Sequence, residues 1–145
     1  MRLISTFDPV RVELLRATLP PPIGWIAVHH WFVVCDDSGR TSRWEVWQNK
    51  NAGGTSWAHV HRDLKAPYSG VGGGKAVRVK RWEGKKAERL AAALADSESY
   101  PHRHRYRPWP GPNSNTYVRW ILRRTGLRCR LGLKAWGQDF PCPCS

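Results

Sequence analysis

Hydrophobic positions near the start of the chain recur at the spacing of a helix. Val12, Leu15 and Leu19 are three or four residues apart, so they would share one side of a helix. Asp8 can cap the free amides of the first turn, and Pro9 suits the first helical position. Three prolines follow Leu19 and would stop the helix. The first 22 residues are therefore predicted to form an N-terminal helix and a proline linker.

The next stretches are rich in β-branched and aromatic residues, which favour strands. Residues 23–34 form a nearly uncharged run that is typical of a strand buried on both faces. Residues 41–47 alternate in pattern and place Glu45 on one face. A turn at residues 36–39 separates the two runs and predicts an antiparallel pair. A third strand is predicted at residues 77–80, where valines alternate with basic side chains.

Two further helices are predicted in the second half of the chain. Residues 83–95 place leucines and alanines on one side, as an amphipathic helix does. The last helix begins at Asn113 or Ser114, since either side chain can cap it, and ends at Gly126. These elements predict a single α+β domain, an antiparallel β-sheet with packed helices, whose core spans about residues 23–140.

The composition of the chain gives it a strong positive charge. The chain has 145 residues, close to the usual size of one domain, and a net charge of +13. Residues 73–145 hold 16 Lys and Arg against 5 Asp and Glu, so this half carries +11. Such a surface attracts polyanions, which keeps a nucleic-acid-binding module open as an alternative function. The basic side chains of that alternative are Arg103, Arg105, Arg107, Arg119, Arg123 and Arg124.

Other function classes find less support in the sequence. No run supplies the roughly 20 apolar residues of a membrane span, and the first 18 residues are charged without an apolar leader, so a cytoplasmic protein is expected. The four cysteines are expected to be reduced thiols. No cofactor or metal is predicted, because Cys142 and Cys144 lack two further ligands at zinc spacing. The His59/His61 and His102/His104 pairs lie beside arginines and are expected to be solvated.

The most specific local feature is the segment from Trp109 to Tyr117. Its prolines and glycine deliver small polar side chains to the first turn of a helix, where free amides favour an anion. Ser114 is the candidate nucleophile there, and His29 or His30 is the candidate base. Only one of the two histidines can face the helix, because neighbouring strand residues face opposite sides.

Glu45 on the paired strand is the candidate third group, which would orient the imidazole. Structural interpretations stand beside these catalytic ones. Asn113 and Ser114 can serve only as helix caps, a strand histidine can be a satisfied core residue, and Glu45 can pair with Arg43 or Arg105.

The same segments resemble a bacterial family, the domain of unknown function numbered thirty-seven fifty. The resemblance rests on residues 26–31, 44–46, 105–117 and 137–140, and its strongest block is Trp-Pro-Gly-Pro-Asn-Ser-Asn-Thr-Tyr. The family pattern has His-Thr-Trp on the first strand, which maps onto His29 and favours it over His30.

A remoter similarity implies a fold and an activity. Circularly permuted papain-like proteins, including the NlpC/P60-like and lecithin:retinol acyltransferase-like enzymes, place a catalytic His on an early strand. Their nucleophilic Cys begins a late helix, where this chain has Ser114. The resemblance implies a papain-like hydrolase or acyltransferase that acts on an amide or ester, with His29 as base and Glu45 as orienting group. Side chains expected to line its cleft are Trp31, Trp47, Trp109, Asn113, Asn115, Tyr117 and Arg105.

Serine makes this activity more demanding than cysteine does. A thiol near an imidazole ionises readily, whereas a hydroxyl must lose its proton during the attack. A catalytically inactive papain-like binding domain is therefore the second alternative, beside the nucleic-acid-binding module.

Overall fold

The computed structural model describes residues 8–22 and 27–143. In these residues the chain forms one six-stranded antiparallel sheet, two α-helices and a short 3-10 helix. The strand order is β4-β5-β3-β2-β1-β6. The strands are β1 (Arg11–Thr18), β2 (Val28–Cys35), β3 (Thr41–Val46), β4 (Thr55–Trp57), β5 (Val60–Arg62) and β6 (Val77–Glu83). The helices are α1 (Gly84–Ala95), η2 (Ser97–Ser99) and α2 (Ser114–Thr125).

The N-terminal helix predicted from the sequence is wrong, because its residues form β1. This strand lies between β2 and β6 and pairs with both in antiparallel register. Successive side chains of a strand point to opposite faces, so Leu14 and Leu15 bury themselves on different sides of the sheet. A strand that is covered on both faces does not need to alternate apolar with polar residues. The apolar residues of β1 recur at a spacing that also fits a helix, which explains the wrong prediction.

The predicted antiparallel pair of strands is confirmed as β2 and β3. Phe32 lies opposite Trp44, and a turn closed by the Asp36 backbone and side chain joins the two strands. The start of the predicted strand, residues 23–26, lies outside the described residues. The observed register puts Phe32 and Trp44 on one face and Trp31 and Glu45 on the other.

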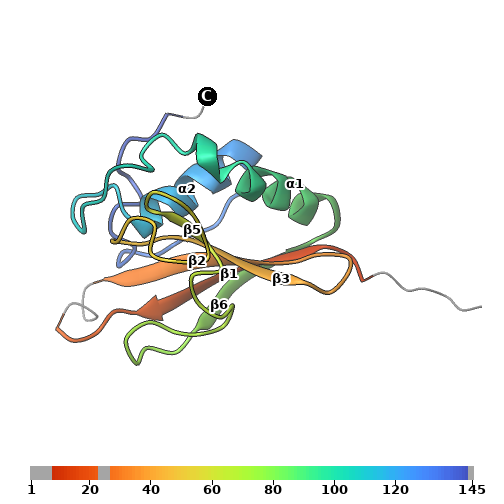
Figure 1. The fold of residues 1–145 in the computed structure, drawn as a ribbon, viewed down its shortest axis with the longest axis horizontal. Coiled ribbons are helices and arrows are strands. Elements are labelled where there is room, and N and C mark those ends of the chain that lie inside the picture. The colour runs from red at the N-terminus through yellow and green to blue at the C-terminus, as the bar shows by residue number, and fades with distance from the viewer. Residues whose placement is uncertain (1–7, 23–26, 144–145) are drawn as a thin grey trace, which may run out of the picture.

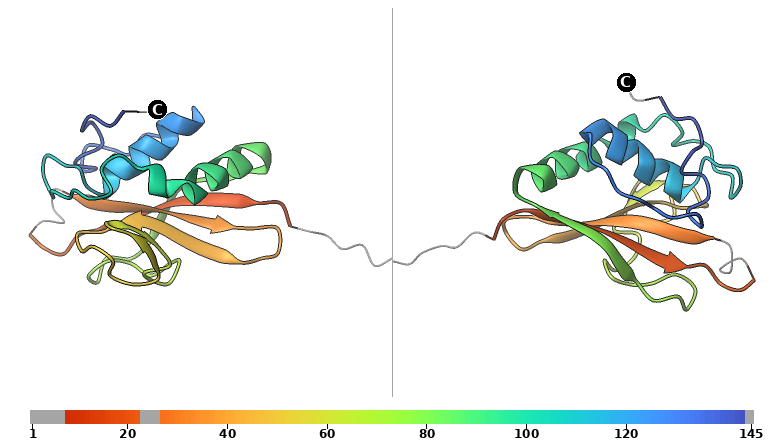
Figure 2. Two further views of the ribbon diagram at one scale, coloured as in Figure 1. Left: turned by 45° about the horizontal axis from the view of Figure 1, so that its top comes forward. Right: turned by 180° about the vertical axis from the view of Figure 1, so that it is seen from behind.

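Both α-helices pack on the same face of the sheet, as Figures 1 and 2 show. The main hydrophobic core lies between this face and the helices, and it includes Leu14, Phe32, Leu90 and Trp120. Both helices begin and end within about one residue of the predicted positions, and Gly126 closes α2 in the left-handed conformation. The predicted α+β class with an antiparallel sheet is therefore confirmed.

A long excursion between β5 and β6 covers the opposite face of the sheet. In the left view of Figure 2 these loops lie below the sheet, away from the helices. A smaller apolar cluster forms beneath them from Leu15, Trp31, Val33 and Val71, and the Trp31 indole donates a hydrogen bond to the Pro67 carbonyl. Both faces of the central strands are thus covered.

The central position of β1 is open to a stability test. Leu14 has no exposed surface, so Leu14→Ala leaves a cavity and is expected to lower the free energy of unfolding by about 2–5 kcal/mol. Arg16→Ala, at an exposed position of the same strand, is the matched control and is expected to change it by less than about 0.5 kcal/mol. Urea denaturation followed by tryptophan fluorescence measures both. Equal, small effects of the two variants would contradict the buried placement.

Candidate functional site

The first turn of α2 is held by a capping box. The Asn113 side-chain oxygen accepts hydrogen bonds from the backbone amides of Asn115 and Thr116, at 2.9 and 3.3 Å. The Thr116 hydroxyl in turn accepts from the Asn113 amide. Two of the free amides expected here are therefore already satisfied. The Ser114 amide has no hydrogen-bond partner among the described residues, so it is available to donate to a negatively charged group.

The C-terminal segment at residues 136–137 contacts the first turn of α2. The Thr116 hydroxyl donates to the Gly137 carbonyl at 2.7 Å, and the Asn115 side-chain amide donates to the Trp136 carbonyl at 2.9 Å. A Cβ atom at Gly137 would lie 2.3 Å from the Asn113 side-chain oxygen, and Gly137 has a φ of +89°. Glycine is therefore required where the segment passes over the cap.

Glu45 forms a buried charged cluster with His29 and Arg43. Its carboxylate accepts hydrogen bonds from His29 Nε2 at 2.7 Å and from Arg43 Nε and Nη2 at 3.0 and 2.9 Å. Arg43 and Glu45 have no exposed surface, and the Arg43 guanidinium lies 4.1 Å above the Trp31 ring. The carboxylate thus pairs with both the imidazole and the arginine, inside the protein and not at its surface.

This cluster determines which nitrogen of His29 carries its proton. Burial opposes ionisation of Glu45, but hydrogen bonds and positive charge from His29 and Arg43 outweigh it and lower the pKa of this carboxyl to about 2. An ionised carboxylate can only accept, so Nε2 of His29 donates. In the neutral imidazole Nδ1 then holds a free lone pair, and no described residue bonds to it. A lone pair oriented in this way is what a general base requires.

His30 points to the other face of β2 and contacts α2. Its Nδ1 lies 2.9 Å from the Asn115 side-chain oxygen, whose amide group donates to the Val28 carbonyl. His30 Nδ1 therefore donates, and its Nε2 is buried with no hydrogen-bond partner among the described residues. Burial is the main cause that lowers the pKa of His30 to about 4, with the positive charges of His29, Arg16 and Arg119 adding to it against the hydrogen bond of Asn115. The histidine that faces the helix is thus a neutral structural link between sheet and helix.

Ser114 and His29 both line a cavity of about 570 Å³. It reaches past the start of β2, since its wall combines His29 and Trp47 with the first residues of α2. The described residues that line it are mainly apolar: Leu19, Pro20, Ala27, Val28, His29, Trp47, Gln48, Lys65, Val71, Gly72, Tyr106, Pro108, Asn113, Ser114, Asn115 and Trp136. No hydrogen bond joins the Ser114 hydroxyl to either histidine within the described part of the chain.

The other residues expected in the cleft are dispersed. Trp47, Asn113 and Asn115 line the cavity, whereas Trp31 lies fully buried beneath Arg43. Tyr117 is buried in the main core, where its hydroxyl bonds to Ser97 at 2.6 Å. Trp109 is 67% exposed and borders a neighbouring hollow, and Arg105 lies over the Phe140 ring.

Several residues of this region were missed by the sequence analysis. Arg43 was considered only as a possible ion-pair partner of Glu45, yet it also donates to the carbonyls of Ala66 and Ser69 and so holds the covering loop. Lys65 enters the cavity wall with its amine 4.4 Å from the Trp47 ring. These contacts join segments that are far apart in the chain, so the local sequence pattern does not indicate them.

The expectation of solvated rings is wrong for His59 and His61, whereas His104 is exposed and His102 is partly exposed. His59 and His61 are buried, and they bond to the Trp47 carbonyl and the Ala52 amide. His102 bonds to the Pro141 carbonyl. Among the described residues no group of three or more His, Cys, Asp or Glu side chains is placed to hold a metal ion. In that same part of the chain, no helix has the length and apolar character needed to cross a membrane.

Fold and site together define an α+β domain with an apolar cavity at one end of its sheet. The chain belongs to the family described as a protein of unknown function, DUF3750, which matches residues 10–140. This match begins one residue before β1, so the strand is part of the family domain and not a linker before it. No curated protein and no solved structure matches the chain.

The buried His30 predicts how stability depends on pH. The unfolded chain protonates this ring near pH 6.5, whereas the folded chain does so only near pH 4, so folding stability falls as the pH drops between these values. His30→Gln removes this titration and is expected to flatten the fall by an amount on the order of 3 kcal/mol. Urea denaturation at several pH values measures it, and a variant profile parallel to that of the wild type would contradict the assignment.

The contact of Gly137 with Asn113 predicts a second effect. Gly137→Ala is expected to displace the capping side chain and to cost at least about 1 kcal/mol more than Gly132→Ala. Gly132 is the matched control, because its φ of +83° is similar but nothing lies within 4 Å of its Cβ position. Thermal and urea unfolding of both variants provide the comparison, and equal losses would show that backbone strain alone is responsible.

Proposed function

We propose that this protein is a papain-like hydrolase or acyltransferase that acts on an amide or ester, with serine in place of the usual cysteine. The observation that carries the proposal is the 2.7 Å hydrogen bond from His29 Nε2 to Glu45, made in the wall of the cavity that Ser114 also lines. Ser114 is the nucleophile, His29 the general base and Glu45 the group that orients the imidazole.

His29 suits the role of base better than His30. His29 lines the cavity, and no described residue bonds to its Nδ1. His30 is not among the residues that line the cavity, and its hydrogen bond to Asn115 fixes it on the helix side. The low pKa of His30 also makes it a weak base.

The proposed reaction follows the roles of these groups. The Ser114 oxygen attacks the carbonyl carbon of the substrate while its proton passes to His29 Nδ1, and the Ser114 amide donates to the developing oxyanion. The carbon–heteroatom bond then breaks, and His29 returns the proton to the departing amine or alcohol. Water hydrolyses the acyl-serine, or a second alcohol or amine takes the acyl group. Substrate binding must bring Ser114 and His29 within hydrogen-bond reach, directly or through one water.

The cavity supports an apolar acyl group as the part of the substrate that is bound. Trp47, Tyr106 and Trp136 contribute aromatic surface, and aliphatic and proline side chains make up much of the remaining wall. Lys65 is the only Lys or Arg in the described lining. Its ammonium group can donate hydrogen bonds to a carboxylate or phosphate at the other end of such a substrate.

A non-catalytic binding domain is the second candidate function. The specific observation in its favour is that the Ser114 hydroxyl makes no hydrogen bond to His29 in the described structure. The same apolar cavity would then hold a ligand without turning it over.

Labelling with a fluorophosphonate probe tests the catalytic proposal. The probe is expected to modify Ser114, as mapped by mass spectrometry, because His29 activates this hydroxyl. Ser114→Ala is expected to abolish labelling, and His29→Ala to slow it at least about 100-fold, the usual size of a general-base contribution. Ser69→Ala removes an exposed serine outside the cavity wall and is expected to label like the wild type.

Two results would contradict the catalytic proposal. Folded wild-type protein that forms no adduct, or an adduct that forms equally fast in His29→Ala, contradicts it. In the first case, an increase in melting temperature with apolar amides or esters, lost when Ser114→Trp fills the cavity, supports the binding domain instead.

A further inference from the structure

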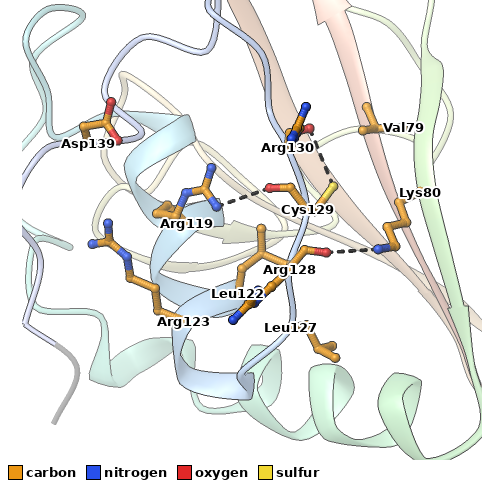
Figure 3. Close-up of a pocket in the computed structure, with 10 residues that line it drawn as sticks. All are labelled: Val79, Lys80, Arg119, Leu122, Arg123, Leu127, Arg128, Cys129, Arg130 and Asp139. Atoms are coloured by element: carbon orange, nitrogen blue, oxygen red, sulfur yellow. Dashed lines mark hydrogen bonds between the residues drawn. The ribbon is translucent and has the colours of Figure 1, made fainter.

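A second hollow, larger than the Ser114 cavity, lies beside α2. Its volume is about 770 Å³, and none of its lining residues borders the cavity of Ser114 and His29. Figure 3 shows Arg119 and Arg123 projecting from α2 and Lys80 from β6, with the segment 127–130 between the helix and the strand. We call this hollow the basic groove; it is lined by Val79, Lys80, Arg119, Leu122, Arg123, Leu127, Arg128, Cys129, Arg130 and Asp139.

The basic groove concentrates positive charge that the protein does not neutralise. Five of its ten lining residues are Lys or Arg, and Asp139 is the single acid among them. In the described structure the guanidinium groups of Arg123, Arg128 and Arg130 make no ion pair and no hydrogen bond, and all three residues are exposed. Two arginines outside the groove are paired instead, Arg81 with Glu83 and Arg124 with Asp96.

The remaining two cations are fixed in place by hydrogen bonds to neutral acceptors. Arg119 donates to the Cys129 carbonyl at 3.2 Å and to the Gln138 side chain at 2.8 Å. Lys80 donates to the Arg128 carbonyl at 2.9 Å. These bonds tie the segment 127–130 to α2 on one side and to β6 on the other. They use neutral acceptors, so both side chains keep their full positive charge in the groove.

The geometry favours an extended polyanion over other anionic partners. Arg119 and Arg123 are one helical turn apart, about 6 Å along the axis of α2. Arg128 and Arg130 are two residues apart on the neighbouring segment. The positive charges are therefore spread along the groove and not concentrated at one position. The apolar groups Val79, Leu122 and Leu127 lie in the hollow itself. A membrane surface instead requires apolar side chains that project outward into the lipid.

We propose that the basic groove binds the phosphodiester backbone of nucleic acid. Guanidinium groups pair with phosphate oxygens in bidentate fashion, which suits the three unpaired arginines. None of the described residues that line the groove is aromatic, so they offer no platform on which bases stack, and binding is expected to be independent of sequence.

The structure also revises which basic residues carry this interaction. Arg119 and Arg123, expected from the sequence, line the groove. Arg124 is instead paired with Asp96 and stacked on Trp120, while Arg103, Arg105 and Arg107 lie outside the groove. Lys80, Arg128 and Arg130 take their place.

The test measures binding of the full chain to a fluorescein-labelled, mixed-sequence single-stranded DNA of 20 nucleotides by fluorescence anisotropy in a salt series. The groove variant is Arg123→Glu with Arg128→Glu and Arg130→Glu. The control variant, Lys50→Glu with Lys75→Glu and Lys86→Glu, changes the net charge equally at exposed positions outside the groove. Circular dichroism confirms that both variants are folded.

The groove variant is expected to bind at least about tenfold more weakly at 100 mM salt, and the control variant to lose less than threefold. The slope of log K against log salt is expected to become shallower by about 2 in the groove variant, because three phosphate contacts are lost at roughly 0.7 each. None of the three substituted arginines lines the cavity of Ser114 and His29, so the result is independent of the catalytic proposal.

Three outcomes would overturn the assignment. These are no binding of the wild type above background, equal losses in the groove and control variants, or loss of binding to phosphatidylglycerol vesicles in the groove variant while DNA binding is unchanged. The second outcome would assign the affinity to overall charge, and the third would assign the groove to a membrane surface.

Discussion

A carboxylate with no exposed surface, Glu45, imposes the strictest requirement on this fold. An ionised group of this kind is stable inside a protein only when opposite charges and donors surround it, and Arg43 and His29 supply them. Arg43 then has remaining N–H groups to satisfy, and it does so on the carbonyls of Ala66 and Ser69. The charged cluster thereby holds the loop that covers this face of the sheet, and with it the wall of the cavity next to Trp47.

A second set of polar contacts joins the two layers at the other side of β2. His30 bonds to Asn115, and Asn115 bonds to both the Val28 carbonyl and the Trp136 carbonyl. One side chain therefore connects the sheet, α2 and the C-terminal segment at the point where the cavity opens. Because His29 and His30 are neighbours on one strand, the candidate base and the structural link are oriented by the same stretch of backbone.

The molecule separates two chemical environments. The Ser114 cavity is largely apolar, with Lys65 as its only Lys or Arg among the described lining residues, whereas the basic groove holds five cations against one acid. α2 contributes to both, since its first residues line the cavity and Arg119, Leu122 and Arg123 line the groove. A helix shared in this way places an apolar cavity and a basic groove in one small domain without common lining residues.

The sequence by itself determined those elements whose signals are local. The β2–β3 pair, α1, and α2 with its Asn113 cap and Gly126 end follow from short-range patterns that the structure retains. Tertiary structure alone decided the state of residues 11–18, because an apolar run fits a helix or a central strand until β2 and β6 are placed on either side of it. It also decided the burial of Arg43 with Glu45 and the meeting of Lys80 with Arg128. The Arg43–Glu45 pair is itself local, because the two residues lie two apart on β3. Its burial and the contact of Lys80 with Arg128 depend on packing between segments distant in the chain, and no spacing within one segment encodes them.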